Sequence, residues 1–523
     1  MTTATPTTTP TTTEATTAAP AYDQLRARLR EIANLTAVAH LAGWDQETYM
    51  PAGGAAGRAN QSAALAAVIH QRSTDATLGE LIAACEADDN VQGSPRDAAN
   101  IREVRRDYDR ATKLPESLVS ELARTGSQAQ EAWKVARGAN DFKAFAPWLE
   151  KMLDLSRQKA ECYGTPEGGE LYDALLDEYE PAARASEIDA IFTPLGERLS
   201  ALIADLRENG TEPDDTPLNT RIPEEMQHAL GLRVLEAIGF DLKQGRLDVT
   251  THPFCQGVGP GDTRLTTRYR DERFTDALYG TMHEGGHGLY EQGLPRHNEG
   301  DPFGEPIADA ISLGIHESQS RMWENSVGRS NAFWTWALPV VNETCGNALG
   351  DYTVEQMNAA VNTAKPSFIR VEADEATYNL HVMLRFGLER AMIKGDLAVQ
   401  DLPGAWNERF KQLLGMDVPD DRRGCLQDVH WSFGLIGYFP TYTLGNLYAA
   451  QFWETINEAI PTLDDQIAAG EMGELLAWLR TNIHAHGRQY HAGELCQRIT
   501  GKPLGADPLL RHLESRLRPV YGL

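Results

Sequence analysis

The chain of 523 residues is 41% hydrophobic and 24% charged, which describes an ordinary globular protein. Its length allows one very large domain or two to four domains of ordinary size. Its formal net charge of -27 argues against nucleic acid as a partner, because phosphate binding needs clustered Lys and Arg.

The amino-terminal stretch MTTATPTTTPTTTEATTAAP is a Thr/Pro/Ala segment of low complexity. It lacks the positive start and the apolar middle of a secretory signal. It is also too poor in large apolar residues to fold, so we expect residues 1–21 to form a disordered tail.

Helical periodicity dominates after this tail. Apolar residues from Leu25 to Leu41 recur at spacings of three and four and predict a helix that ends before Pro51. Similar patterns predict further helices over residues 118–136, 147–163, 185–206 and 223–237. The fold class is therefore mainly α.

Strand signals are sparse. Arg246 to Phe254 alternates in polarity, and Thr263 to Arg270 is rich in β-branched residues. The Gly/Pro-rich segment CQGVGPGD lies between them. We predict a small antiparallel β element just before the helix that begins at Phe274.

No apolar run approaches the ~20 residues that span a bilayer, so we expect no membrane partner. The six cysteines are widely scattered and form no CxxC pair. This spacing argues against a disulfide framework and fits a cytoplasmic location.

The segment FTDALYGTMHEGGHGLYEQG contains a metal-binding pattern. His283 and His287 are four residues apart, so both rings lie on one face of a helix and can reach one ion. Glu284 can reach a water on that ion, which is the HExxH arrangement of zinc hydrolases with Glu as general base.

The pattern does not supply a third histidine, because Tyr290 and Gly293 replace the residues of the longer metzincin motif. A carboxylate from a second helix should complete a His₂Glu set and leave a position for water. Glu317 is favoured only modestly over Glu324, and the further downstream candidates are Glu291, Glu299 and Glu305.

Other short motifs lie along the chain, before and after the metal-binding pattern. In order they are WDQETYMPAGG, HPF at 252–254, DTRLT at 262–266, HEGGH at 283–287, HESQS at 316–320, IRVEAD at 369–374 and GCLQDVHW at 424–431. This series resembles the carboxypeptidase Taq family of zinc metallocarboxypeptidases. The resemblance covers residues 22–523, which we expect to form one catalytic domain.

The resemblance implies a large two-lobed helical domain around a deep active-site groove, similar to neurolysin and angiotensin-converting enzyme. It also implies a homodimer that removes single residues from the free carboxyl ends of peptides with broad specificity. Zinc is the implied metal, and cobalt can substitute. The metal ligands become His283, His287 and Glu317, and Glu284 becomes the base.

Gly285, Gly286 and Gly288 are poor helix formers within this metal-binding helix. Our hypothesis is that they let another backbone element, or the substrate, approach the helix closely.

Recognition of a free carboxylate suits an arginine, whose guanidinium matches both oxygens. The family likeness indicates Arg370, for which the alternative is an ion pair with Glu372 or Asp374. Arg264 could assist, or could form a structural salt bridge to Asp262. His252 either lines the groove or makes a structural turn.

By analogy with the related helical peptidases, His430 and Tyr438 are candidates to donate to the developing oxyanion. Tyr442 is the runner-up for the phenol, and core packing is the alternative for each aromatic residue. Asp309 and Asp428 are candidates to orient the ligand histidines.

Two other functions stay open. One is an endopeptidase or dipeptidase on the same helical scaffold, which would share the metal chemistry. The other is a non-catalytic peptide-binding scaffold with a structural zinc, although such a site would not need Glu284.

Overall fold

The computed structural model describes residues 20–296 and 302–523. The predicted tail therefore lies outside the described residues except for its last two positions, and so does Glu299. The first helix begins at Ala21, the last residue of the predicted tail.

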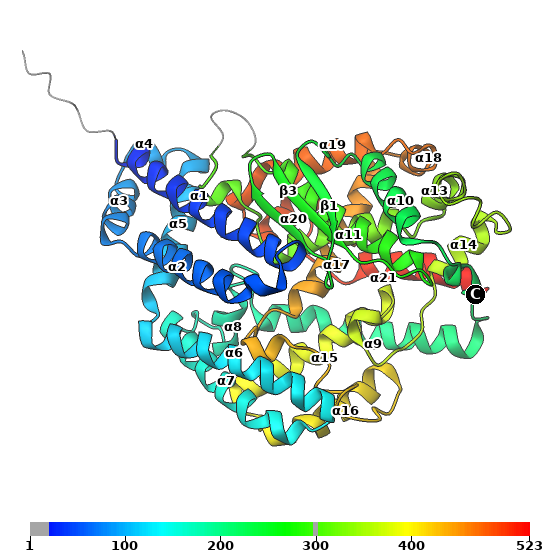
Figure 1. Ribbon diagram of the computed structural model, residues 1–523, viewed down its shortest axis with the longest axis horizontal. Coiled ribbons are helices and arrows are strands. Elements are labelled where there is room, and N and C mark those ends of the chain that lie inside the picture. The colour runs from blue at the N-terminus through cyan, green and yellow to red at the C-terminus, as the bar shows by residue number, and fades with distance from the viewer. Residues whose placement is uncertain (1–19, 297–301) are drawn as a thin grey trace, which may run out of the picture.

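Five helices form the amino-terminal part, drawn in blue in Figure 1. They are α1 (Ala21–Thr48), α2 (Ala55–Ser73), α3 (Ala76–Glu86), α4 (Asp89–Gln92) and α5 (Pro95–Lys113). The predicted first helix is confirmed, and it ends at Thr48, before Pro51. Its apolar stripe is not buried throughout, because Val38 is 55% exposed and Leu41 38% exposed.

The other predicted helices are also present. They correspond to α6 (Glu116–Ala139), α7 (Phe142–Tyr163), α9 (Ala185–Asn209) and α10 (Glu224–Ala237), and a short α8 (Leu171–Leu176) precedes α9. Helix α7 begins five residues before the predicted start at Pro147, because Asp141 caps it by accepting from the Ala144 amide. Pro147 therefore lies inside α7, beyond its first turn, and the helix continues there without one backbone hydrogen bond.

The small sheet is mixed, with strand order β1-β3-β2. Its strands are β1 (Gly245–Val249), β2 (Cys255–Gly259) and β3 (Asp262–Thr267). The two predicted strands pair in parallel, with Leu247 opposite Leu265. The prediction that these two segments form an antiparallel ribbon was therefore wrong. The antiparallel partner of β3 is β2, which comes from the Gly/Pro-rich segment between them.

Two helices after the sheet carry the metal-binding pattern. They are α11 (Phe274–Gly293) and α12 (Leu313–Arg321), and α12 continues as a π-helical turn over Met322–Val327. The remaining helices are α13 (Asn331–Thr344), α14 (Val354–Val361), α15 (Glu375–Lys394), α16 (Leu402–Leu414), α17 (Pro440–Ala459), α18 (Leu463–Ala469), α19 (Gly473–Asn482), α20 (Ala492–Thr500) and α21 (Asp507–Tyr521).

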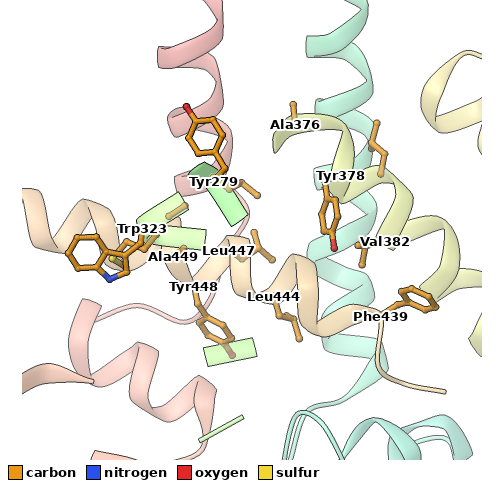
Figure 2. Packing of buried hydrophobic residues seen from close by; sticks show 14 of the residues in the cluster. Tyr279, Trp323, Ala376, Tyr378, Val382, Phe439, Leu444, Leu447, Tyr448 and Ala449 are labelled. Atoms are coloured by element: carbon orange, nitrogen blue, oxygen red, sulfur yellow. The ribbon is translucent and has the colours of Figure 1, made fainter. Parts of the chain in front are cut away.

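The helices form two groups in Figure 1, one around the sheet and α11 and the other containing α6, α7, α9, α15 and α16. Helix α17 connects them through buried side chains. Figure 2 shows Leu444 and Leu447 of α17 between Trp323 on one side and Tyr378 and Val382 on the other. The mainly helical fold with a small sheet is thus confirmed, and α17 packs against α12.

Buried apolar residues form one large cluster through the body and a second, smaller one among the amino-terminal helices. The second cluster contains Leu25, Leu78, Ile82, Cys85, Val91, Ile101 and Val104. No helix in the described part of the chain has the length and hydropathy that a membrane crossing requires.

Candidate metal centre

Helix α11 places the two histidines of the pattern on one face, as the spacing predicts. The Nε2 atoms of His283 and His287 lie 3.6 and 3.4 Å from one carboxylate oxygen of Glu317 on α12. Ligand atoms of these three residues lie within 4.8 Å of one another. Two imidazoles and a carboxylate from two helices form a donor set that suits a divalent metal ion.

The start of α12 is held by polar contacts, which sets the position of Glu317. Ser312 caps the helix by accepting from the Ile315 amide. Glu180, which is buried, accepts from the Ser312 hydroxyl at 3.0 Å and from the Gly314 amide at 3.0 Å. A carboxylate at this end also complements the helix dipole.

Glu317 is oriented by Arg321 one turn later, whose Nε donates to its second oxygen at 2.7 Å. Burial opposes ionisation, but Arg321 and the two imidazoles hold the pKa of Glu317 well below its usual range. The carboxyl is therefore an anion that can bind a cation.

The other candidate carboxylates contact different groups. Glu324 lies on the outer side of His283, with its oxygen 2.9 Å from Nδ1, so it orients this histidine instead of facing the three clustered ligand atoms. Glu291 contacts His316. Glu305 accepts from Arg26 and Asn100 of the amino-terminal helices.

The two histidines differ in electrostatics. Burial lowers the pKa of His287 to about 3, which keeps it neutral as a metal ligand must be. Burial acts in the same direction on His283, but the carboxylates of Glu317 and Glu324 raise the pKa of His283 to about 8. The negative charge around His283 thus favours a cation.

Glu284 is also buried, on the adjoining face of α11. Burial raises the pKa of its carboxyl to about 7, and the charge of His283 acts against this shift. A carboxyl with a pKa near neutrality can both accept and return a proton, as a general base does.

The glycines of α11 mark close approaches of other elements. A Cβ on Gly286 would lie 2.6 Å from the backbone oxygen of Gln319 in α12, so another backbone element passes there, as our hypothesis required. At Gly285 and Gly288 the neighbours are apolar side chains, Leu235 and Ile238 for the first and Phe240 and Leu265 for the second.

Arg370 is 4% exposed and binds Asp428 instead of Glu372 or Asp374. Its Nη2 donates to Asp428 at 2.8 Å, and its Nη1 donates to the Tyr378 hydroxyl at 2.8 Å. Arg385 donates to the second oxygen of Asp428 at 2.7 Å. Two guanidinium groups around one carboxylate leave a net positive charge in this cluster.

The positive cluster adjoins the metal-binding residues through Tyr378. The guanidinium of Arg321 lies 4.5 Å from the Tyr378 ring, while the hydroxyl of the same ring accepts from Arg370. Arg321 in turn contacts Glu317. A chain of direct contacts therefore connects Arg370 with Glu317.

Arg264 forms two contacts of 2.8 Å with Asp262, so the structural salt bridge is present. Its guanidinium also lies 4.1 Å from the Trp44 ring. His252 is exposed in the turn between β1 and β2. Neither residue is among the three whose ligand atoms cluster.

His430 and Tyr438 lie together in an aromatic cluster, with ring centroids 5.5 Å apart. The Tyr442 ring lies 5.4 Å from that of Tyr438. Burial lowers the pKa of His430 to about 4, so its imidazole is neutral at pH 7. The pKa of Tyr438 is raised chiefly by burial and also by the charge of Glu317.

Sequence reasoning missed the contact of Arg321 with Glu317 and that of His316 with His287, and it misplaced the orienting carboxylates. Asp428 binds two arginines, and Asp309 is paired with Arg296, instead of either orienting a clustered histidine. The one available signal was helical spacing, because Arg321 follows Glu317 by four residues.

Comparison with known proteins agrees with this geometry. A family model described as carboxypeptidase Taq (M32) metallopeptidase matches residues 24–517. Thermostable carboxypeptidase 1 of Thermus thermophilus is 46% identical over 510 residues, which cover 96% of this chain and 99% of the relative. Carboxypeptidase 1 of Bacillus subtilis is 35% identical and covers 95% of this chain and 97% of its own.

Solved structures show the same relationship. The crystal structure of the M32 carboxypeptidase from Deinococcus radiodurans R1 matches with a TM-score of 0.92 and 41% identity, over 96% of this chain and 100% of that one. A Pyrococcus furiosus carboxypeptidase matches with a TM-score of 0.90 and 34% identity, over 95% of this chain and 99% of that one.

Proposed function

The chain belongs to the carboxypeptidase Taq (M32) family of metallopeptidases, and we propose that it removes single residues from peptides with zinc held by His283, His287 and Glu317. The family makes the protein a metallocarboxypeptidase, a hydrolase that acts on peptides with a divalent metal. The observation that carries the assignment of residues is the cluster of three ligand atoms beside the buried carboxyl of Glu284. Broad side-chain specificity is part of the proposal.

Zinc, when bound, supplies Lewis-acid activation of water and of the scissile carbonyl. Glu284 takes the proton from the attacking water and returns it to the leaving amine. Its pKa of about 7 suits both transfers, because the carboxylate and the acid are both accessible near neutral pH. His287, neutral and buried, keeps a lone pair available for the ion.

The developing oxyanion needs donors, and His430 and Tyr438 are our candidates. The phenol of Tyr442 is the runner-up. The position of these rings in one cluster, and the influence of Glu317 on the pKa values of Tyr438 and Tyr442, support a place beside the reacting centre.

The carboxyl end of the peptide would be recognised by the positive cluster that contains Arg370. The second guanidinium, from Arg385, leaves this cluster with more positive than negative charge, which favours an incoming carboxylate. Arg264 and His252 are proposed as auxiliary substrate contacts. The groove that would hold the peptide stays a prediction.

The decisive experiment compares a short peptide with its carboxyl-terminal amide, with products identified by mass. We expect stepwise release of single residues from the free acid and little cleavage of the amide. Equal cleavage of both would favour the endopeptidase or dipeptidase alternative. Glu284→Gln tests the proposed base. It should abolish turnover and keep the bound metal, whereas surviving activity would contradict the role of Glu284.

We also propose that cobalt can replace zinc, that the enzyme works as a homodimer, and that it is cytoplasmic. All six cysteines are free, which suits a reducing compartment. Activity of the metal-free protein after addition of each ion, and its mass in solution by light scattering, test the first two proposals.

A further inference from the structure

The outer side of His287 contacts a second imidazole. Its Nδ1 lies 2.5 Å from Nδ1 of His316, the residue that precedes Glu317. The other nitrogen of His316, Nε2, lies 2.9 Å from a carboxylate oxygen of Glu291. Glu291 in turn forms an ion pair with Arg296.

The protons in this chain of contacts follow from the acceptors. An ionised Glu291 can only accept, so Nε2 of His316 must carry a hydrogen. A neutral His316 then has a bare Nδ1, which can only accept from Nδ1–H of His287. This leaves Nε2 of His287 without a hydrogen, and Nε2 is the atom that faces Glu317 at 3.4 Å.

Packing holds the second imidazole in this orientation. The Tyr290 ring lies 5.2 Å from His316 at an angle of 65°. His484 packs on the other side of Tyr290, at 5.1 Å, and contacts Gln319 of α12 through Nε2 at 3.0 Å. Rotation of His316 away from His287 would therefore break its contact with the buried Tyr290 ring.

The two histidines of the metal site are supported differently. Nδ1 of His283 contacts the carboxylate of Glu324 directly, at 2.9 Å. Nδ1 of His287, in contrast, reaches a carboxylate through His316. The neutral ring of His316 thus separates the Glu291 carboxylate from Nδ1 of His287. It can keep the hydrogen on that Nδ1 without placing a carboxylate directly against it.

We infer that His316 and Glu291 are positioning residues that set the tautomer of His287 and so present its Nε2 to the metal, an inference that rests on the proposed metal-binding function. Neither residue contacts substrate in this role. Groups that orient a ligand histidine typically change metal affinity by 10–100-fold when they are removed.

The test measures zinc affinity of the full-length protein by competition with a chelator, and the visible absorption spectrum of the cobalt-loaded protein. His316→Leu removes the acceptor and should weaken zinc binding by about 10–100-fold and change the cobalt spectrum. His316→Asn places an amide oxygen near the position of Nδ1 and should restore most of the affinity. Glu291→Gln should cause a smaller loss than His316→Leu.

His484→Leu is the matched control, because His484 is buried in the same cluster and does not contact His287. We expect it to leave zinc affinity and the cobalt spectrum close to those of the unmodified protein. If His316→Leu bound zinc with unchanged affinity, the inference would be wrong. It would also be wrong if His316→Asn were no better than His316→Leu, because packing alone would then explain the effect.

Failure of the proposed function gives a different result. A protein that binds zinc with this pattern of affinities but cleaves no peptide would contradict the carboxypeptidase mechanism and leave the positioning role intact. If His316→Leu did not fold, the comparison of His316→Asn and Glu291→Gln with the unmodified protein would decide. Unchanged zinc affinity and cobalt spectrum in Glu291→Gln would then contradict the inference.

Discussion

At Gly286 the backbone of α12 passes closer to α11 than any side chain would permit. A Cβ there would lie 2.6 Å from the Gln319 oxygen and 2.7 Å from the Ser320 Cα, and backbone atoms cannot move aside as a flexible side chain can. The lower helix propensity of glycine is offset by this packing, because tertiary contacts hold most helices of globular proteins.

We predict that Gly286→Ala pushes α12 away from α11 and separates Glu317 from the two histidines. Overpacking of this kind typically lowers the free energy of unfolding by about 1–3 kcal/mol. Zinc affinity should fall as well, measured by chelator competition, and turnover should fall with it.

Gly280→Ala on the same helix is the control. Its Cβ would find only the Thr267 hydroxyl, at 3.8 Å, which is ordinary contact. This variant should keep zinc affinity and gain up to about 1 kcal/mol of stability from helix propensity. Identical behaviour of the two variants would show that close approach is not the reason for Gly286.

At the scale of elements, Glu389 of α15 joins three other segments. Its carboxyl accepts from the Tyr172 hydroxyl and the Trp431 indole, each at 2.8 Å, and from the Gly437 amide at 3.0 Å. Trp431 directly follows His430, and Gly437 directly precedes Tyr438. The buried carboxyl therefore fixes the segment that carries both proposed oxyanion donors.

Burial raises the pKa of Glu389 from 4.5 to about 7, and the three donors act against this shift. In the unfolded chain the group ionises near its ordinary value, so between these two pH values the folded state binds more protons. The free energy of unfolding should therefore fall as pH rises from 4.5 to about 7, by about 3 kcal/mol from this group alone.

Glu389→Gln removes the titrating group, so we predict a smaller loss of stability between pH 5 and pH 8 than in the unmodified protein. Denaturant unfolding at several pH values measures this difference. Glu408→Gln changes an exposed carboxyl of α16 and should leave the pH dependence unchanged. An unaltered pH dependence in Glu389→Gln would contradict the raised pKa.

For the whole molecule, the amino-terminal helices have a small hydrophobic cluster of their own, and polar contacts connect them to the body. Glu305 accepts from Arg26 at 2.6 Å and from Asn100 at 2.8 Å. Arg488 donates to Glu103 and Asp107, each at 2.8 Å. Separate apolar cores are expected to open in separate cooperative steps.

We predict that Leu25→Ala, which truncates a fully buried side chain of the small cluster, destabilises the amino-terminal helices by about 2–5 kcal/mol. Amide hydrogen exchange should become faster in α1, α3 and α5 and stay unchanged in α11 and α12. Leu41→Ala on the same helix removes a partly exposed side chain and should have little effect. Equal acceleration throughout the protein would show a single cooperative core instead.

Much of this organisation is local and could be predicted from the sequence. Periodicity located α1, α6, α7, α9 and α10, because burial of one helical face repeats every three to four residues. The spacing of His283 and His287 is also local, because both residues lie on one helix. Spacing favoured Glu317 over Glu324 only modestly, and the family likeness made the choice. Glu324 lies in the π-helical turn and contacts His283 from there, which helical periodicity does not predict.

The sequence by itself determined the helical class, the pair of histidines with the glutamate beside them, and the family. Only the tertiary structure decided that Arg370 binds Asp428, 58 residues away, that β1 pairs in parallel with β3, and that His316 lies against His287. The reason is physical: a spacing of four residues fixes direction within one helix, whereas contacts between distant segments depend on how whole elements pack. Gly286 illustrates both cases. The sequence shows that this residue has no side chain, and only the tertiary structure shows that the backbone of α12 occupies the space.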